Sequence, residues 1–173
     1  YSENAKGNGK IISVGDELEK FIKYIKGAEN GILAGWDKNT QLWKPYGSAQ
    51  VTIGYGIVFK LNGKLNVVTP QMKDAISPYL NDTTKIRVTN QDMERELRTQ
   101  ISNGLINIKR DLNKLYGEGA YDNMKDKYKY AIYDLYHNFG PSGYKEGANL
   151  KEHKPINIRF IEAAVNNDLT GMI

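Results

Sequence analysis

The longest regular pattern in this sequence is a set of apolar residues that recurs every three or four positions across residues 89–115. The repeating residues are Met93, Leu97, Ile101, Leu105, Ile108, Leu112 and Leu115. Because an α-helix has 3.6 residues per turn, this spacing predicts one amphipathic helix of about seven turns. Thr89 and Asp92 are typical of its start. A helix of this length suits a strut between a β-containing lobe and a helical lobe.

Other helices are indicated by shorter patterns of the same kind. Residues 1–12 are polar and contain glycine, which favours a flexible arm or linker. A helix is expected to begin near Ser13, with an apolar face of Leu18, Phe21, Ile22 and Ile25. Thr69-Pro70 predicts the start of a short helix that carries Met72, Ile76, Tyr79 and Leu80. Two further helices are expected, from Lys127 to His137 and from about Ile156.

Strand signals are concentrated before residue 70. Residues 50–61 are rich in β-forming residues and predict one strand, Asn62-Gly63 is a strong hairpin turn signal, and residues 64–68 predict the return strand. The expected fold class is therefore α+β, with residues 13–69 as the β-containing lobe and residues 70–173 as the helical lobe of one domain.

Composition excludes several classes of protein. The chain has 173 residues and no cysteine, which excludes disulfides, thiol nucleophiles and thiolate metal sites. No apolar run approaches the roughly 18 residues of a membrane-spanning helix. The two histidines lack metal-ligand spacing, and we expect neither a metal nor a cofactor. The net charge of +4 allows anionic partners. The lysines are interspersed with acids, which disfavours nucleic-acid binding.

Three residues before position 60 could carry glycoside hydrolysis. That reaction needs a carboxylic acid that protonates the leaving oxygen and a second carboxylate that activates water or attacks the sugar. Glu29 continues the apolar face of the first helix, where partial desolvation would raise the pKa of its carboxyl group, as a general acid requires. Asp37 lies in a polar loop and should stay ionised, which suits a base, and the Thr52 hydroxyl could hold the water.

Residues near Glu29, Asp37 and Thr52 in the sequence could bind a sugar. Each of these residues also has an ordinary structural interpretation. Gly54 and Gly56 would let the backbone approach a saccharide, and Trp36, Trp43, Tyr46 and Tyr55 could stack on sugar rings. Alternatively, Glu29 is a solvated helix-end carboxylate, Asp37 a turn residue and Thr52 a strand residue. The aromatic residues would then pack in the core.

The ordered set Glu29-Asn30-Gly31-x-Leu33, Asp37 and Thr52-Ile53-Gly54-Tyr55-Gly56 resembles the phage-type lysozymes, the family of the T-even bacteriophage enzyme. Downstream, residues 88–91 resemble the start of the family's interlobe helix. Residues 130–132 and 138–143 resemble its Asn-x-Gly-Pro-Gly helix end, and residues 160–171 its next helix and turn. Bacteriocin and effector relatives such as the pesticin-like lysozyme domain look similar.

The resemblance implies a lysozyme-like fold with the active cleft between two lobes. It implies a metal-free, bacteriolytic muramidase that cuts the β-1,4 bond between N-acetylmuramic acid and N-acetylglucosamine in peptidoglycan with inversion. Glu29 would be the general acid, Thr52 the water-positioning residue and Asp37 the nearest candidate for the base. Gly54, Tyr55, Trp36 and Asn138 would bind substrate. Such an enzyme would be secreted or delivered to the periplasm or cell wall, where an inhibitor or immunity protein is a further partner.

The sequence departs from the family pattern at three points. Glu29 and Thr52 are 23 positions apart, wider than usual, so an insertion around residues 38–50 must be accommodated and the base assignment stays open. The family histidine after Gly-Tyr-Gly is Ile57 here. Family members usually continue beyond the point that corresponds to Ile173, which leaves the completeness of the helical lobe open.

Two other functions fit the same residues. A cell-wall binding module could keep the cleft without the chemistry, and it would bind peptidoglycan without releasing reducing ends. A lytic transglycosylase needs the glutamate but no base, and its products carry 1,6-anhydro ends.

Overall fold

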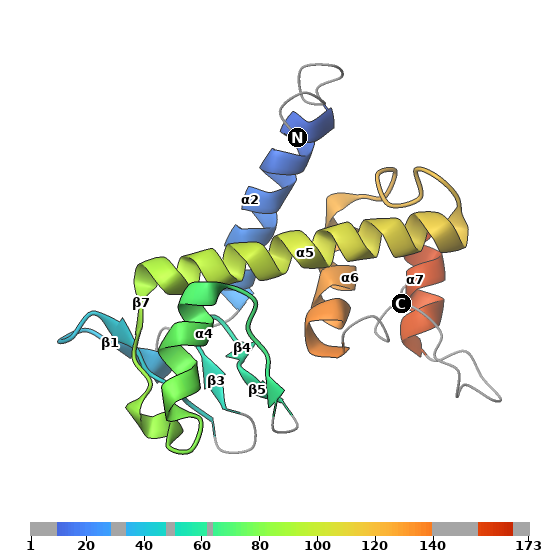
Figure 1. Ribbon diagram of the computed structural model, residues 1–173. Coiled ribbons are helices and arrows are strands. Elements are labelled where there is room, and N and C mark those ends of the chain that lie inside the picture. The colour runs from blue at the N-terminus through green and yellow to red at the C-terminus, as the bar shows by residue number, and fades with distance from the viewer. Residues whose placement is uncertain (1–9, 29–33, 48–50, 62–63, 140–155, 168–173) are drawn as a thin grey trace. The chain divides into compact units, whose positions relative to one another are not determined.

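The computed structural model describes residues 10–28, 34–47, 51–61, 64–139 and 156–167, which form an α+β structure (Figure 1). The chain forms two compact units, residues 1–101 and 102–173, and the boundary falls within one long helix, α5. The helices are α2 (Lys10–Ala28), α4 (Pro70–Ile76), α5 (Asn90–Tyr116), α6 (Asp126–Phe139) and α7 (Ile156–Val165). In the described residues, no helix is both long enough and apolar enough to span a membrane.

The helices predicted from periodicity are confirmed, with shifted ends. α2 begins at Lys10, three residues before the predicted start, and buries Phe21, Ile22 and Ile25 as expected. α5 has 27 residues, and Met93, Leu97, Ile101, Ile108 and Leu112 of its predicted apolar face are buried. The short helix ends at Ile76, before Tyr79 and Leu80, because Pro78 lacks the N–H that a continuing α-helix needs.

The strands are short and belong to the first unit. The described residues form three sheets, with strand orders β1-β2-β7, β3-β4 and β5-β6, all antiparallel. Each strand has two residues: β1 (Trp36–Asp37), β2 (Leu42–Trp43), β3 (Thr52–Ile53), β4 (Ile57–Val58), β5 (Lys60–Leu61), β6 (Lys64–Leu65) and β7 (Val88–Thr89). Leu61 pairs with Lys64, which confirms the predicted hairpin. Its turn residues, Asn62 and Gly63, lie outside the described residues.

The prediction of one strand over residues 50–61 is wrong. Ile53 pairs with Ile57, so the segment folds back on itself through Gly54, Tyr55 and Gly56. The φ angles of the two glycines are 60° and 80°, values that L side chains rarely adopt and that a strand cannot contain. The return strand is also shorter than the predicted residues 64–68: β6 ends at Leu65.

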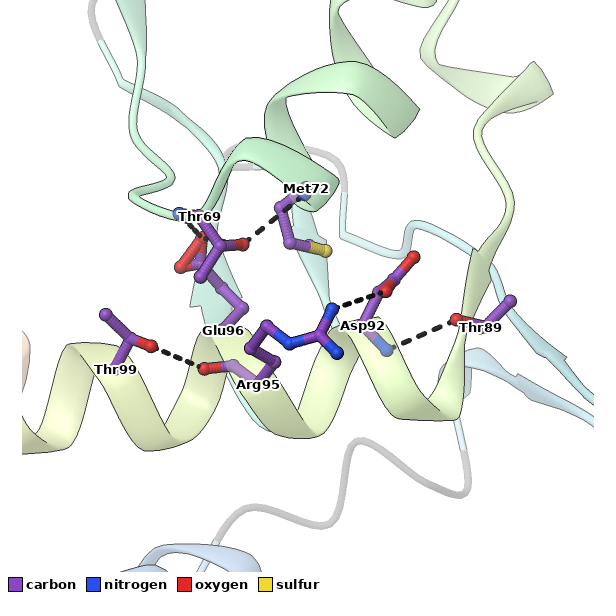
Figure 2. A network of polar contacts seen from close by, with 7 residues as sticks. All are labelled: Thr69, Met72, Thr89, Asp92, Arg95, Glu96 and Thr99. Atoms are coloured by element: carbon purple, nitrogen blue, oxygen red, sulfur yellow. Dashed lines mark hydrogen bonds and ion pairs between the residues drawn. The ribbon is translucent and has the colours of Figure 1, made fainter.

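A buried carboxylate joins α4 to α5 in the first unit. Glu96 on α5 is fully buried, and its Oε1 accepts a hydrogen bond from the backbone N–H of Val68 at 2.7 Å. The same oxygen accepts one from the backbone N–H of Thr69 at 3.0 Å (Figure 2). The Thr69 hydroxyl in turn accepts from the N–H of Met72 at 3.4 Å and caps α4, as the Thr69-Pro70 signal predicts. Since these N–H groups lie at a helix start with no helical partner, Glu96 has a structural role.

The second unit is built around the tyrosine-rich helix α6. At Gly104 of α5, an added Cβ would lie 2.7 Å from the Tyr136 ring and 3.0 Å from the Tyr133 ring, so glycine permits this close approach of the two helices. Asn167, after α7, has a φ of 52°. Its side chain accepts a hydrogen bond from the N–H of Lys125 at 3.3 Å and donates one to the carbonyl of Asn123 at 3.3 Å. These two bonds fix α7 to the segment that precedes α6.

Candidate active site

The turn Thr52–Gly56 is held on both sides within the first unit. Gly54 is buried, and a Cβ added to it would lie 2.2 Å from the Sδ atom of Met93 on α5. The Tyr46 hydroxyl donates a hydrogen bond to the Gly54 carbonyl at 2.8 Å and accepts one from the Gly56 N–H at 3.3 Å. The glycine at position 54 therefore serves close packing against α5, and any contact of Gly54 with a ligand would involve its backbone.

Thr52 is positioned by backbone hydrogen bonds at the start of this turn. Its N–H donates to the Tyr46 carbonyl at 2.9 Å, and its carbonyl accepts from the Tyr46 N–H at 2.8 Å. Thr52 also pairs with Val58 across β3 and β4. The threonine is half-buried, so its backbone is fixed while part of the residue remains accessible.

Three aromatic rings form a row that begins at the turn. The Tyr55 ring packs edge-on against Trp43, with the centroids 5.2 Å apart, and Trp43 lies 5.0 Å from Trp36. Trp43 is only 1% exposed and Tyr55 9%, whereas Trp36 is half-buried. Burial raises the pKa of the Tyr55 hydroxyl, and the Glu94 carboxylate raises it further, against a lowering by Lys26. Trp36 is therefore the member of the row that a sugar ring could cover.

Asp37 lies at the start of the loop that joins β1 to β2. Its Oδ1 accepts hydrogen bonds from the N–H of Asn39 at 2.9 Å and of Thr40 at 3.4 Å, and its Oδ2 lies 3.8 Å from the Lys44 ammonium. These contacts lower the pKa of the carboxyl group, and the Asn39 hydrogen bond has the largest effect. Asp37 is thus ionised near neutral pH, and both of its oxygens have partners within the hairpin itself.

A charged pair next to the turn was not predicted from the sequence. Lys26, in the last turn of α2, forms an ion pair with Glu94 of α5, and its Nζ atom lies 5.3 Å from the centroid of the Tyr55 ring. The side chains of Lys26 and Glu94 are 33% and 34% exposed. The two residues are 68 positions apart, and no local pattern signals such a contact.

Two other predicted site residues are not described at the side-chain level. Glu29 lies outside the described residues, immediately after Ala28, the last residue of α2. Asn138 belongs to the last turn of α6, and its side chain lies outside the described part. Trp36, Asp37, Thr52, Gly54 and Tyr55 all belong to the first unit. Within the described ranges, no three His, Cys, Asp or Glu side chains come together in a way that could hold a metal ion.

In comparisons with protein-family models, with curated proteins and with solved structures, no match to this chain was found.

Proposed function

We propose that this chain is a peptidoglycan hydrolase of the lysozyme type, an N-acetylmuramidase that cleaves the β-1,4 bond between N-acetylmuramic acid and N-acetylglucosamine with inversion. One arrangement carries the proposal. The Thr52–Gly56 turn is held between Tyr46 and Met93, in the same unit as α2, whose last residue directly precedes Glu29. A threonine on a fixed turn, and a glutamate that directly follows the first helix in the sequence, are the combination that the resemblance to phage-type lysozymes requires.

In the proposed reaction, Glu29 protonates the glycosidic oxygen as the bond breaks, and a carboxylate activates a water on the opposite face of the sugar. Thr52 holds this water through its hydroxyl group. Because catalysis requires reacting groups at fixed separations, a turn with little freedom favours this role for Thr52. Asp37, which is ionised, is the sequence-based candidate for the second carboxylate.

Substrate binding is proposed for four residues. Trp36 offers a partly exposed ring on which a sugar can stack. Gly54 and Tyr55 shape the turn beside the substrate, and Asn138 is included on the basis of the resemblance. The substrate places the activity in the bacterial cell wall, reached by secretion or by delivery to the periplasm.

The proposal can be tested with purified peptidoglycan, the parent chain and Glu29→Gln, which keeps the size of the side chain but cannot donate the proton. The parent should release reducing ends, and loss of general acid catalysis should lower the rate by about 10²–10⁴-fold. If Glu29→Gln releases reducing ends as fast as the parent, the assignment of Glu29 is wrong. If the parent binds peptidoglycan without producing new ends, the chain is a binding module instead.

A further inference from the structure

A second carboxylate, that of Glu94, is linked to the glycine turn through Lys26. Met93 packs beneath Gly54, and Glu94 is the next residue on α5. The Glu94 carboxylate contacts the Lys26 ammonium, which in turn lies over the Tyr55 ring of the turn. Through Lys26, Glu94 of α5 is therefore connected to the last turn of α2 and to the Thr52–Gly56 turn.

Asp37 and Glu94 differ in how their oxygens are engaged. Both oxygens of Asp37 have partners in its own hairpin: Oδ1 accepts two loop N–H groups, and Oδ2 faces Lys44. For Glu94, the contact with Lys26 involves Oε1, and the described part of the chain shows no hydrogen bond to Oε2. Since one third of the Glu94 side chain is exposed, a water molecule can reach it.

The ion pair also gives Glu94 a defined position. Surface ion pairs contribute little to stability, about 0–1 kcal/mol, so the pair of Lys26 and Glu94 is expected to add little to the free energy of unfolding. Lys26 connects Glu94 to α2 and, through the Tyr55 ring, to the turn that carries Thr52. Glu94 is thereby linked through one lysine to two segments that are far from it in the sequence.

We infer that Glu94, oriented by Lys26, is the general base of the reaction, an assignment that rests on the proposed muramidase function. Glu94 takes a proton from the water as the water oxygen forms a bond to the anomeric carbon. At the same time the bond from that carbon to the glycosidic oxygen breaks, and the oxygen receives the proton of Glu29. Glu94 ends protonated and Glu29 ionised, and exchange with solvent restores both. Lys26 is a positioning residue, because it acts through Glu94.

The test compares kcat on purified peptidoglycan for the parent, Glu94→Gln and a matched control. Glu19→Gln is the control, because Glu19 forms a second ion pair between α2 and α5, with Arg98 at 2.6 Å, and has no contact with the turn among the described residues. Loss of the base should lower kcat by about 10²–10⁴-fold in Glu94→Gln, with KM nearly unchanged, whereas Glu19→Gln should keep the parent's kcat.

Sodium azide separates a chemical role from a structural one. In Glu94→Ala, azide can attack the anomeric carbon without a base, so the rate should recover with azide and the product should be a glycosyl azide. A loss of activity caused by misfolding would not recover, and such a result overturns the inference, as does a parent-like kcat in Glu94→Gln. If Asp37→Asn loses activity and recovers it with azide instead, Asp37 is the base.

The same experiments distinguish an error in the proposed function from an error in the role of Glu94. A parent chain that produces no new ends refutes the muramidase and this inference together. A parent that is active and is inactivated by Glu29→Gln, but not by Glu94→Gln, refutes only the role of Glu94.

Discussion

Replacing Gly54 with alanine should destabilise the first unit strongly. At a φ of 60°, an L residue with a Cβ is strained by about 1–2 kcal/mol. The new methyl group would lie 2.2 Å from the Met93 Sδ atom, far inside the normal contact distance of about 3.5–4 Å. Relief of such overpacking typically costs a further 1–3 kcal/mol, so we expect the free energy of unfolding to fall by about 2–5 kcal/mol.

The measurement is urea unfolding of four chains: the parent, Gly54→Ala, Met93→Ala and the double variant. Met93 is fully buried, so Met93→Ala alone should cost about 2–5 kcal/mol. Met93→Ala removes the sulfur atom with which the new methyl group clashes. In the Met93→Ala background, Gly54→Ala should therefore lower the free energy of unfolding only by the backbone strain, about 1–2 kcal/mol.

Gly27→Ala is a control that makes the same substitution but should change the free energy of unfolding in the opposite direction. An added Cβ at Gly27 has nothing within 4 Å and lies in the last turn of α2, so alanine should stabilise by up to about 1 kcal/mol. The packing argument is refuted if Gly54→Ala is equally costly with and without Met93, or if its effect matches that of Gly27→Ala.

Three further predictions concern polar groups. Glu96→Ala removes the acceptor of the part-buried Val68 N–H and of the buried Thr69 N–H, and should lower the free energy of unfolding by about 2–6 kcal/mol in urea, with a smaller loss for Glu96→Gln, which keeps one acceptor oxygen. Asn167→Ala removes two hydrogen bonds and strains a residue with a φ of 52°, and should cost about 1–3 kcal/mol in the same assay; a value within about 0.3 kcal/mol of the parent contradicts this. Burial raises the pKa of Tyr133 in the folded state, so its contribution to stability is complete below the unfolded pKa of about 10 and is lost as the pH rises above it; Tyr133→Phe should make the alkaline loss of stability shallower, and an identical pH profile refutes the claim.

The elements that could be predicted are those with a local cause. The period of α5 follows from apolar spacing over 27 residues, and the start of α4 follows from Thr69 and Pro70. The Asn62-Gly63 signal likewise predicted the pairing of Leu61 with Lys64. In each case, residues that are close in the sequence determine the backbone by themselves.

The features that could not be predicted depend on contacts between distant residues. The segment 50–61 has strong β propensity throughout, yet β3 and β4 form a hairpin within it, because Gly54 packs on Met93 and the Tyr46 hydroxyl forms hydrogen bonds with Gly54 and Gly56. The burial of Glu96 and the pairing of Lys26 with Glu94 likewise have no local signal. Of the candidate site, Thr52 and Trp36 were proposed from the sequence, whereas Glu94 was not, because its contact with Lys26 joins residues 68 positions apart.

Digestion of purified peptidoglycan in water enriched in ¹⁸O, followed by mass spectrometry of the fragments, tests whether this chain is a hydrolase. A muramidase produces reducing N-acetylmuramic acid ends that carry one ¹⁸O atom from the attacking water, and Glu29→Gln should produce them far more slowly. Fragments with 1,6-anhydro ends and no ¹⁸O would identify a transglycosylase. A parent chain that produces neither kind of end, or a Glu29→Gln variant that matches the parent, would refute the proposed function.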